Sequence, residues 1–149
     1  MLIGRIDSGV YQLLLILHIV AVIVAFAPAV VHPLMGNRLR GDGAAVRSFS
    51  VAASAATRTV YLPALVLVGV LGFGLIAVSD GAYEFSDPWV SASILLWLII
   101  AAVVGAVILP AERLLATGDA GAEPKLRAGG GIVSLLLLVV LFLMVVKPG

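Results

Sequence analysis

The sequence predicts an all-α membrane protein, an antiparallel four-helix transmembrane bundle that forms a single membrane domain over residues 1–149. Two observations support this fold class. Hydrophobic residues make up 62% of the chain and charged residues only 11%, whereas soluble domains contain roughly 45–50% apolar and about 25% charged residues. The apolar residues also come in runs long enough to cross a hydrocarbon core about 30 Å thick as helices. A water-soluble fold is therefore excluded.

Four apolar segments separated by turn-forming loops are the predicted helices. We place them at about residues 11–34, 60–78, 89–114 and 131–146. The first begins at Tyr11, an interfacial anchor, and contains Pro28 and Pro33, which predict a kink in its second half. Residues 44–59 are rich in alanine and serine and either lie on the membrane surface or extend the second helix.

The basic residues predict the orientation, because cytoplasmic flanks of membrane helices retain lysine and arginine. Most of them flank the first and third loops, namely Arg38, Arg40, Arg47, Arg58, Arg113, Lys125 and Arg127. Only Arg5 and Lys147 flank the opposite side, whose loop contains Asp80, Glu84 and Asp87. The pattern predicts a multi-pass protein of the cell membrane with both termini outside.

Composition also limits chemistry and partners. The net charge of +1 gives no reason to expect nucleic acid, and the absence of cysteine excludes disulfides and thiolate metal sites. No phosphate-binding glycine loop and no set of serine, histidine and carboxylate suitable for catalysis is present. We therefore predict no catalytic residue and no metal site. The expected partners are the lipid bilayer and either a second copy of the chain or a larger membrane complex.

His18 is the ionisable side chain predicted to lie well inside the membrane, roughly 10 Å below the outer surface. Gly72 and Gly74 of the second helix and Trp97 of the third reach the same depth, and the glycines leave space there. An intramembrane ionisable residue is a functional hypothesis by default. His18 either hydrogen-bonds across helices or binds a ligand. We predict no cofactor if His18 only hydrogen-bonds. If His18 binds a ligand, haem b is the candidate, because imidazole is a common haem ligand.

A second group of polar residues is predicted at the inner interface, where His32, Arg58 and Glu112 have similar depths. The favoured interpretation makes Arg58 a topology anchor and Glu112 a solvated helix end. The alternative is an ion pair between Arg58 and Glu112, with Arg113 as another partner. His32 is expected to contact lipid headgroups or a loop carbonyl.

A stripe of small residues in the third helix predicts close contact with a neighbouring helix. Its members are Ala101, Ala102, Gly105 and Ala106. Small side chains at this spacing let two helix backbones approach each other within the membrane.

The segment from Leu17 to Pro28, continuing to His32-Pro33-Leu34, resembles the first helix of a bacterial family of small integral membrane proteins of unknown function. That resemblance implies the four-span layout and no activity. A weaker similarity joins this helix to the haem-pathway membrane protoporphyrinogen oxidases and to copper-resistance membrane domains. It is carried by His18 and the pair Phe26-Ala27, with Pro28 standing where glycine is usual.

These features favour a polytopic membrane protein without evident catalytic machinery that acts as an accessory or assembly subunit. Two alternatives remain open. The first is a membrane protein that binds haem or another small ligand through His18. The second is a minimal transporter that assembles as a dimer, which would need a polar pathway through the bundle.

Overall fold

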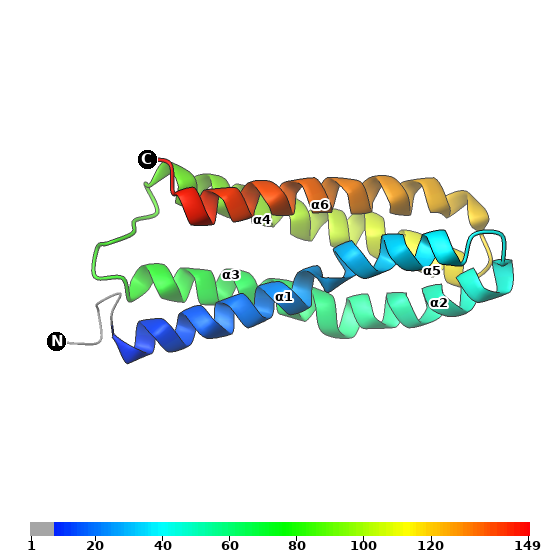
Figure 1. The fold of residues 1–149 in the computed structure, drawn as a ribbon, viewed down its shortest axis with the longest axis horizontal. Helices are drawn as coiled ribbons and strands as arrows, with labels where there is room; N and C mark the ends of the chain where they lie inside the picture. The colour runs from blue at the N-terminus through cyan, green and yellow to red at the C-terminus, as the bar shows by residue number, and fades with distance from the viewer. Residues whose placement is uncertain (1–7) are drawn as a thin grey trace.

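The computed structural model describes residues 8–149, which fold into four long helical spans with no strand among them (Figure 1). The helices are α1 (Gly9–Arg38), α2 (Gly43–Ala56), α3 (Leu62–Ala77), α4 (Pro88–Val103), α5 (Leu109–Ala116) and α6 (Glu123–Val146). Two π-helical turns, η1 (Thr57–Tyr61) and η2 (Val104–Ile108), and a short 3₁₀ helix, η3 (Ala120–Ala122), complete the order. By length and composition, all four spans are able to cross a membrane. The all-α fold class is confirmed.

Because η1 joins α2 to α3 without a break, residues 44–59 extend the second helix instead of lying apart on the surface. The resulting span, Gly43–Ala77, has 35 residues and is roughly 52 Å long at 1.5 Å per residue. This length exceeds a hydrocarbon core of about 30 Å. Part of α2 therefore extends beyond the apolar layer or the whole span tilts.

The last helix begins at Glu123, earlier than the predicted start near residue 131, and runs through three consecutive glycines. Glycine disfavours a helix by about 1 kcal/mol relative to alanine. Here the first of the three provides a close helix contact, because a Cβ on Gly129 would lie 3.2 Å from side-chain atoms of both Val107 and Ile108. Packing against η2 thus outweighs the poor helix propensity of this segment.

The helices pack as different pairs toward the two ends of the molecule. We call the end with residues 78–87 the acidic end, and the end with residues 39–42 and 117–122 the basic end. Toward the acidic end α1 packs along α3 and α4 along α6, whereas toward the basic end α2 packs along α5. Figure 1 shows the start of α1 and the end of α6 at the acidic end, on the left.

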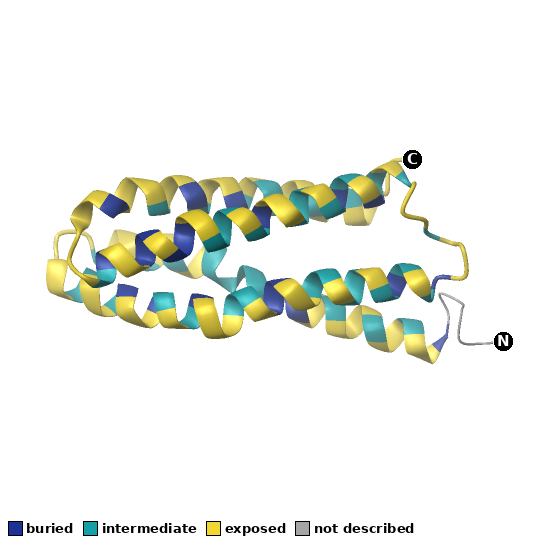
Figure 2. Cartoon of the chain, turned by 180° about the vertical axis from the view of Figure 1, so that it is seen from behind, coloured by how far each residue is buried: buried dark blue, intermediate teal, exposed yellow. Residues whose placement is uncertain are grey.

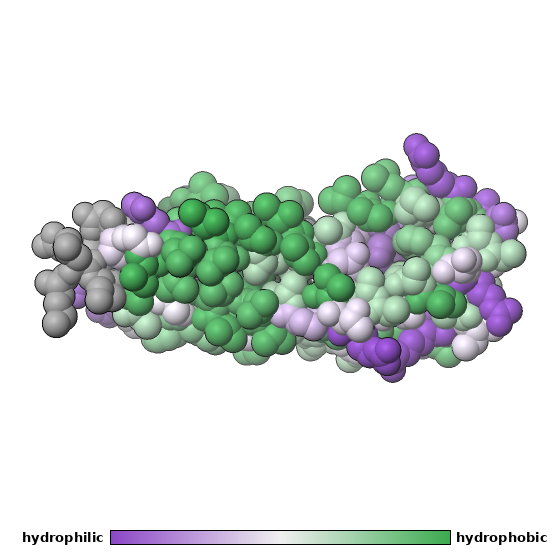
Figure 3. Space-filling view, turned by 90° about the horizontal axis from the view of Figure 1, so that it is seen from below, coloured by the Kyte–Doolittle hydropathy of each residue, from purple (hydrophilic) through white to green (hydrophobic). Residues whose placement is uncertain are grey.

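Large apolar side chains cover the outside of the bundle. Figure 2 shows exposed residues along every helix, and in Figure 3 hydrophobic side chains cover the middle of the visible face while hydrophilic ones gather mainly toward the ends. Leu138 of α6, for example, is 65% exposed. Such faces are unfavourable in water and favourable in a lipid bilayer. The helices are therefore expected to contact lipid.

The buried centre is built around Leu65, Ile100, Ile108 and Val133. Trp97 connects α4 to α3, since its indole Nε1 donates a hydrogen bond to the Leu65 carbonyl at 2.8 Å. The tightest contact at a described glycine lies beside this bond, where a Cβ on Gly69 would overlap the Trp97 ring. In contrast, a Cβ on Gly105 would meet no other atom within 4 Å. The predicted small-residue stripe therefore does not make its close contact at Gly105.

The two π-helical turns each precede a proline in a recurring five-residue pattern, Val-x-Leu-Pro-Ala, at residues 60–64 and 107–111. A proline has no N–H to bond the carbonyl four residues earlier, so the helix before it is easily altered. In both spans the preceding turn widens to a five-residue bond, from Leu62 N to Thr57 O and from Leu109 N to Val104 O. Such π turns occur frequently at functional sites.

Candidate ligand cavity

Glu112 of α5 is the most deeply buried charged residue of the described chain, with 1% exposure. It lies two residues after Pro110 and is one of the buried residues of α5. Neither carboxyl oxygen has a hydrogen bond of good geometry to a described residue. Its nearest charged or chargeable partner is His32, whose Nδ1 lies 3.3 Å from Glu112 Oε1. The buried side chain of Thr57 also interacts with this carboxyl group.

His32 of α1 is held by aromatic rings as well as by Glu112. Its imidazole makes edge contacts with Phe49 of α2, at 5.5 Å between ring centroids, and with Tyr61 of η1, at 6.3 Å. The side chain keeps 16% exposure. Because Nδ1 faces Glu112, the ring nitrogen left for an external partner is Nε2.

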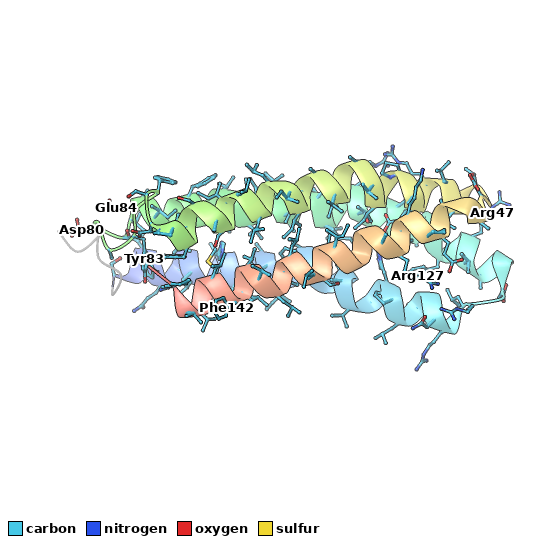
Figure 4. The ribbon with its side chains drawn as sticks, turned by 90° about the horizontal axis from the view of Figure 1, so that it is seen from above. Arg47, Asp80, Tyr83, Glu84, Arg127 and Phe142 are labelled. Atoms are coloured by element: carbon cyan, nitrogen blue, oxygen red, sulfur yellow. The ribbon has the colours of Figure 1, made fainter. Side chains whose placement is uncertain are left out.

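The exposed part of His32 belongs to the wall of a cavity of about 430 Å³ between α1, η1, η2 and α6. Most of this wall is apolar and aromatic. Its main members are Phe26, His32, Tyr61, Ile108, Val133 and Ser134. At the rim toward the basic end, Arg127 pairs with Glu123 at 2.7 Å, and Figure 4 shows Arg127 at this end of the molecule. The two π turns form part of the wall, so the prolines that widen them also shape the cavity.

The structure changes the predicted partners at the inner interface. His32 and Glu112 are brought together, but Arg58 and Arg113 are exposed, and neither forms an ion pair within residues 8–149. Both interpretations of Glu112 were wrong, because it is buried instead of being a solvated helix end and it contacts His32 instead of Arg58. The physical reason is rotational, because Arg58 follows the buried Thr57 and its side chain leaves the helix on another face.

His18 lies within the bundle beside Gly72, as predicted, because a Cβ on Gly72 would lie 3.4 Å from His18 Cε1. The ring hydrogen-bonds to the Val68 backbone, while Nδ1 is buried without a partner among the described residues. The other members of the predicted site lie elsewhere. A Cβ on Gly74 would contact Leu14, and the Trp97 ring covers Gly69.

At the acidic end, Lys147 connects the end of α6 to the loop before α4. Its Nζ donates a hydrogen bond to the Tyr83 hydroxyl at 2.6 Å and lies 5.6 Å from the centre of the Trp89 ring. This hydrogen bond lowers the pKa of Tyr83 below its ordinary value. The contact joins this loop to the end of α6, and Figure 4 shows Tyr83 at the acidic end.

Sequence reasoning missed the cavity and the roles of Thr57, Phe49 and Tyr61. The available signal was the repeated Val-x-Leu-Pro-Ala pattern, which marks the same kind of helix distortion in two neighbouring spans. Depth counting alone could not show that a cavity forms between these distortions.

Comparisons with protein-family models, with curated proteins and with solved structures find no match to this chain. The fold and the cavity therefore carry the functional argument.

Proposed function

We propose that the chain is a multi-pass membrane protein that binds a small, mainly apolar molecule in the cavity beside His32. The observation that carries this proposal is the cavity of about 430 Å³ with a single imidazole in its wall, backed by a buried carboxyl group. Ligand pockets usually have volumes of about 300–1,000 Å³ and apolar walls with a few convergent polar groups. The cavity fits that description.

An internal comparison supports a role for Glu112 beyond packing. Leu65 follows Pro63 by two residues, as Glu112 follows Pro110, and both are buried, with exposures of 2% and 1%. A leucine therefore fills the corresponding position of the other span. Burying a poorly paired carboxyl group costs several kcal/mol. An accessory subunit that only packs against partners would have no use for this costly group.

Glu112 has a specific task in this proposal, which is to orient His32. A carboxyl oxygen that accepts a hydrogen bond from one imidazole nitrogen fixes the tautomer and raises the basicity of the other nitrogen, in the protonated as well as in the ionised carboxyl group. With its proton on Nδ1, His32 presents Nε2 to the cavity as a hydrogen-bond acceptor. A ligand with an apolar body and one N–H or O–H donor would complement this wall.

The absence of native cysteine makes the cavity directly testable. A single cysteine in the Ala29→Cys variant would lie in the cavity wall, and the Leu138→Cys variant places one on an exposed apolar face as the control. Purified variants are reacted with methyl methanethiosulfonate with and without 1-hydroxyadamantane, an apolar cage with one O–H donor. We expect the cage compound to slow the reaction in the Ala29→Cys variant only. Equal rates with and without it in that variant would contradict the proposal.

Haem binding by His18 is the second candidate, favoured by one observation, the buried and unpartnered Nδ1 of this residue. An absorption spectrum of the purified protein tests it. A Soret band that disappears in the His18→Ala variant would support a haem ligand at this position. A wild-type spectrum without the band, after expression with added haem precursor, would contradict it.

A further inference from the structure

We infer that the cavity takes up a lipophilic monocation, a protonated amine, in exchange for one proton from Glu112. This inference rests on the proposed function, since it names the ligand class of the same cavity. It follows from the charges around Glu112, from the geometry of the His32 ring and from the aromatic side chains of the wall.

The first step concerns charge. The arginines nearest to Glu112 in the described chain do not pair with its carboxyl group. Arg58 and Arg113 are exposed, and the Arg47 Nε donates to the Ala116 carbonyl at 3.1 Å. On α6, Arg127 pairs with Glu123. Among residues 8–149, the titratable groups left facing the site are His32 from α1 and Tyr61 from η1. A carboxylate here would lack a fixed cation, so the empty site is expected to keep the Glu112 proton.

The second step concerns the balance of the exchange. In the empty site both Glu112 and His32 are neutral. When an ammonium ion enters, its N–H donates to His32 Nε2 and His32 Nδ1–H donates to the Glu112 carboxylate. The carboxyl proton leaves to water. One positive charge enters and one leaves, so the buried site stays neutral overall and the cost of an isolated charge in the membrane is avoided.

The third step concerns the wall. Phe26 and Tyr61 line the cavity, and aromatic ring faces attract cations that have lost part of their water. The remaining wall is mainly apolar and suits the hydrocarbon body of an amine. A neutral molecule of the same shape fits the same space but cannot compensate a carboxylate. It should therefore bind without releasing a proton.

The test compares 1-aminoadamantane with its neutral isostere 1-hydroxyadamantane, using the full chain in detergent. Calorimetry gives the affinities, and a pH indicator in weak buffer gives the protons released. We expect the amine to release one proton per bound molecule and its affinity to rise by about tenfold per pH unit while the empty site is protonated. We expect no proton release with the isostere. Binding of the amine without proton release would overturn the inference, and this measurement needs no variant.

The Glu112→Gln variant provides the second test, because glutamine keeps the size of the side chain and cannot ionise. We expect its affinity for the amine to fall at least tenfold and to lose its pH dependence, while the neutral isostere binds as it does to the wild type. Unchanged amine binding would overturn the exchange. If neither the amine nor the neutral isostere binds to either protein, the cavity itself is no ligand site and the proposed function fails. If only the isostere binds, the ligand class alone is wrong.

Discussion

Glu112 and His32 depend on each other for their burial. The carboxyl group has no well-aligned hydrogen bond, and the imidazole Nδ1 at 3.3 Å is its nearest chargeable partner. Removing one member of a buried neutral pair leaves the other without a partner, which costs about 1–3 kcal/mol, whereas replacing both members with apolar residues is often neutral or stabilising. Comparing the stability of the single and the double variant therefore shows whether the fold requires this pair.

A double-mutant cycle on these two residues should show that asymmetry. The His32→Phe variant, which leaves the neutral Glu112 carboxyl group without its partner, is expected to lose about 1–3 kcal/mol of unfolding free energy. The combined His32→Phe and Glu112→Leu variant is expected to match or exceed the wild type, because leucine occupies the corresponding position after Pro63. Denaturation in mixed micelles measures both. A double variant less stable than the single one would show that the carboxyl group supports the fold.

At the level of single residues, sequence reasoning located groups by depth and failed to pair them correctly. Counting along the helices placed His32, Arg58 and Glu112 at one level, and it placed His18 beside Gly72. Which side chains meet also depends on helix rotation, and a π turn alters the rotation of all residues beyond it. The sequence before Pro63 does not show how large this change of rotation is, so the contact between His32 and Glu112 was not predicted.

Among the elements, the glycines of the spans differ in what surrounds them. A Cβ on Gly69 would overlap the Trp97 ring, which is fixed by its hydrogen bond to the Leu65 carbonyl. A Cβ on Gly105 would meet open space. Composition cannot distinguish these two positions, because both glycines lie in apolar helices.

Alanine substitutions at these two glycines make a matched pair. Gly69→Ala is expected to destabilise the bundle by about 1–3 kcal/mol, because the added methyl group forces Trp97 from its place. Gly105→Ala should be neutral or slightly stabilising, since alanine favours a helix over glycine. Thermal unfolding followed by circular dichroism compares them. A greater loss at Gly105 would place the close helix contact on the predicted small-residue stripe after all.

The elements themselves were largely predictable, because runs of apolar residues define spans whatever their partners. The structure confirms four spans and an all-α fold. The sequence left one alternative open, and one bound was missed. Residues 44–59 are amphipathic enough to suit a surface position, and the α2–α5 contact decides that they continue the second span. Residues 123–130 contain glycines that usually end a helix, and packing against η2 overrides this tendency.

For the whole molecule, the charges divide between the two ends. Figure 4 shows Arg47 and Arg127 at the basic end and Asp80 and Glu84 at the acidic end. Because positive flanks stay in the cytoplasm during insertion, we expect the basic end and the rim with Arg127 to face the cytoplasm. The cavity would then open toward the cytoplasmic half of the membrane.

Cysteine labelling tests this orientation with two exposed alanines, so that no charge changes. In intact cells an impermeant maleimide should label the Ala82→Cys variant and spare the Ala120→Cys variant. After permeabilisation it should label both, because both positions are exposed. Labelling of Ala120→Cys in intact cells, with Ala82→Cys protected, would reverse the orientation.

The central claim is that Glu112 sets the state of the His32 ring that faces the cavity, and nitrogen NMR of labelled histidine tests it most directly. The chain has only two histidines, so the His18→Asn variant assigns both sets of signals. We predict that His32 in the wild type carries a proton on Nδ1. We also predict that Glu112→Gln shifts the His32 ring nitrogens and leaves those of His18 in place. Identical His32 signals in the wild type and in Glu112→Gln would contradict the account.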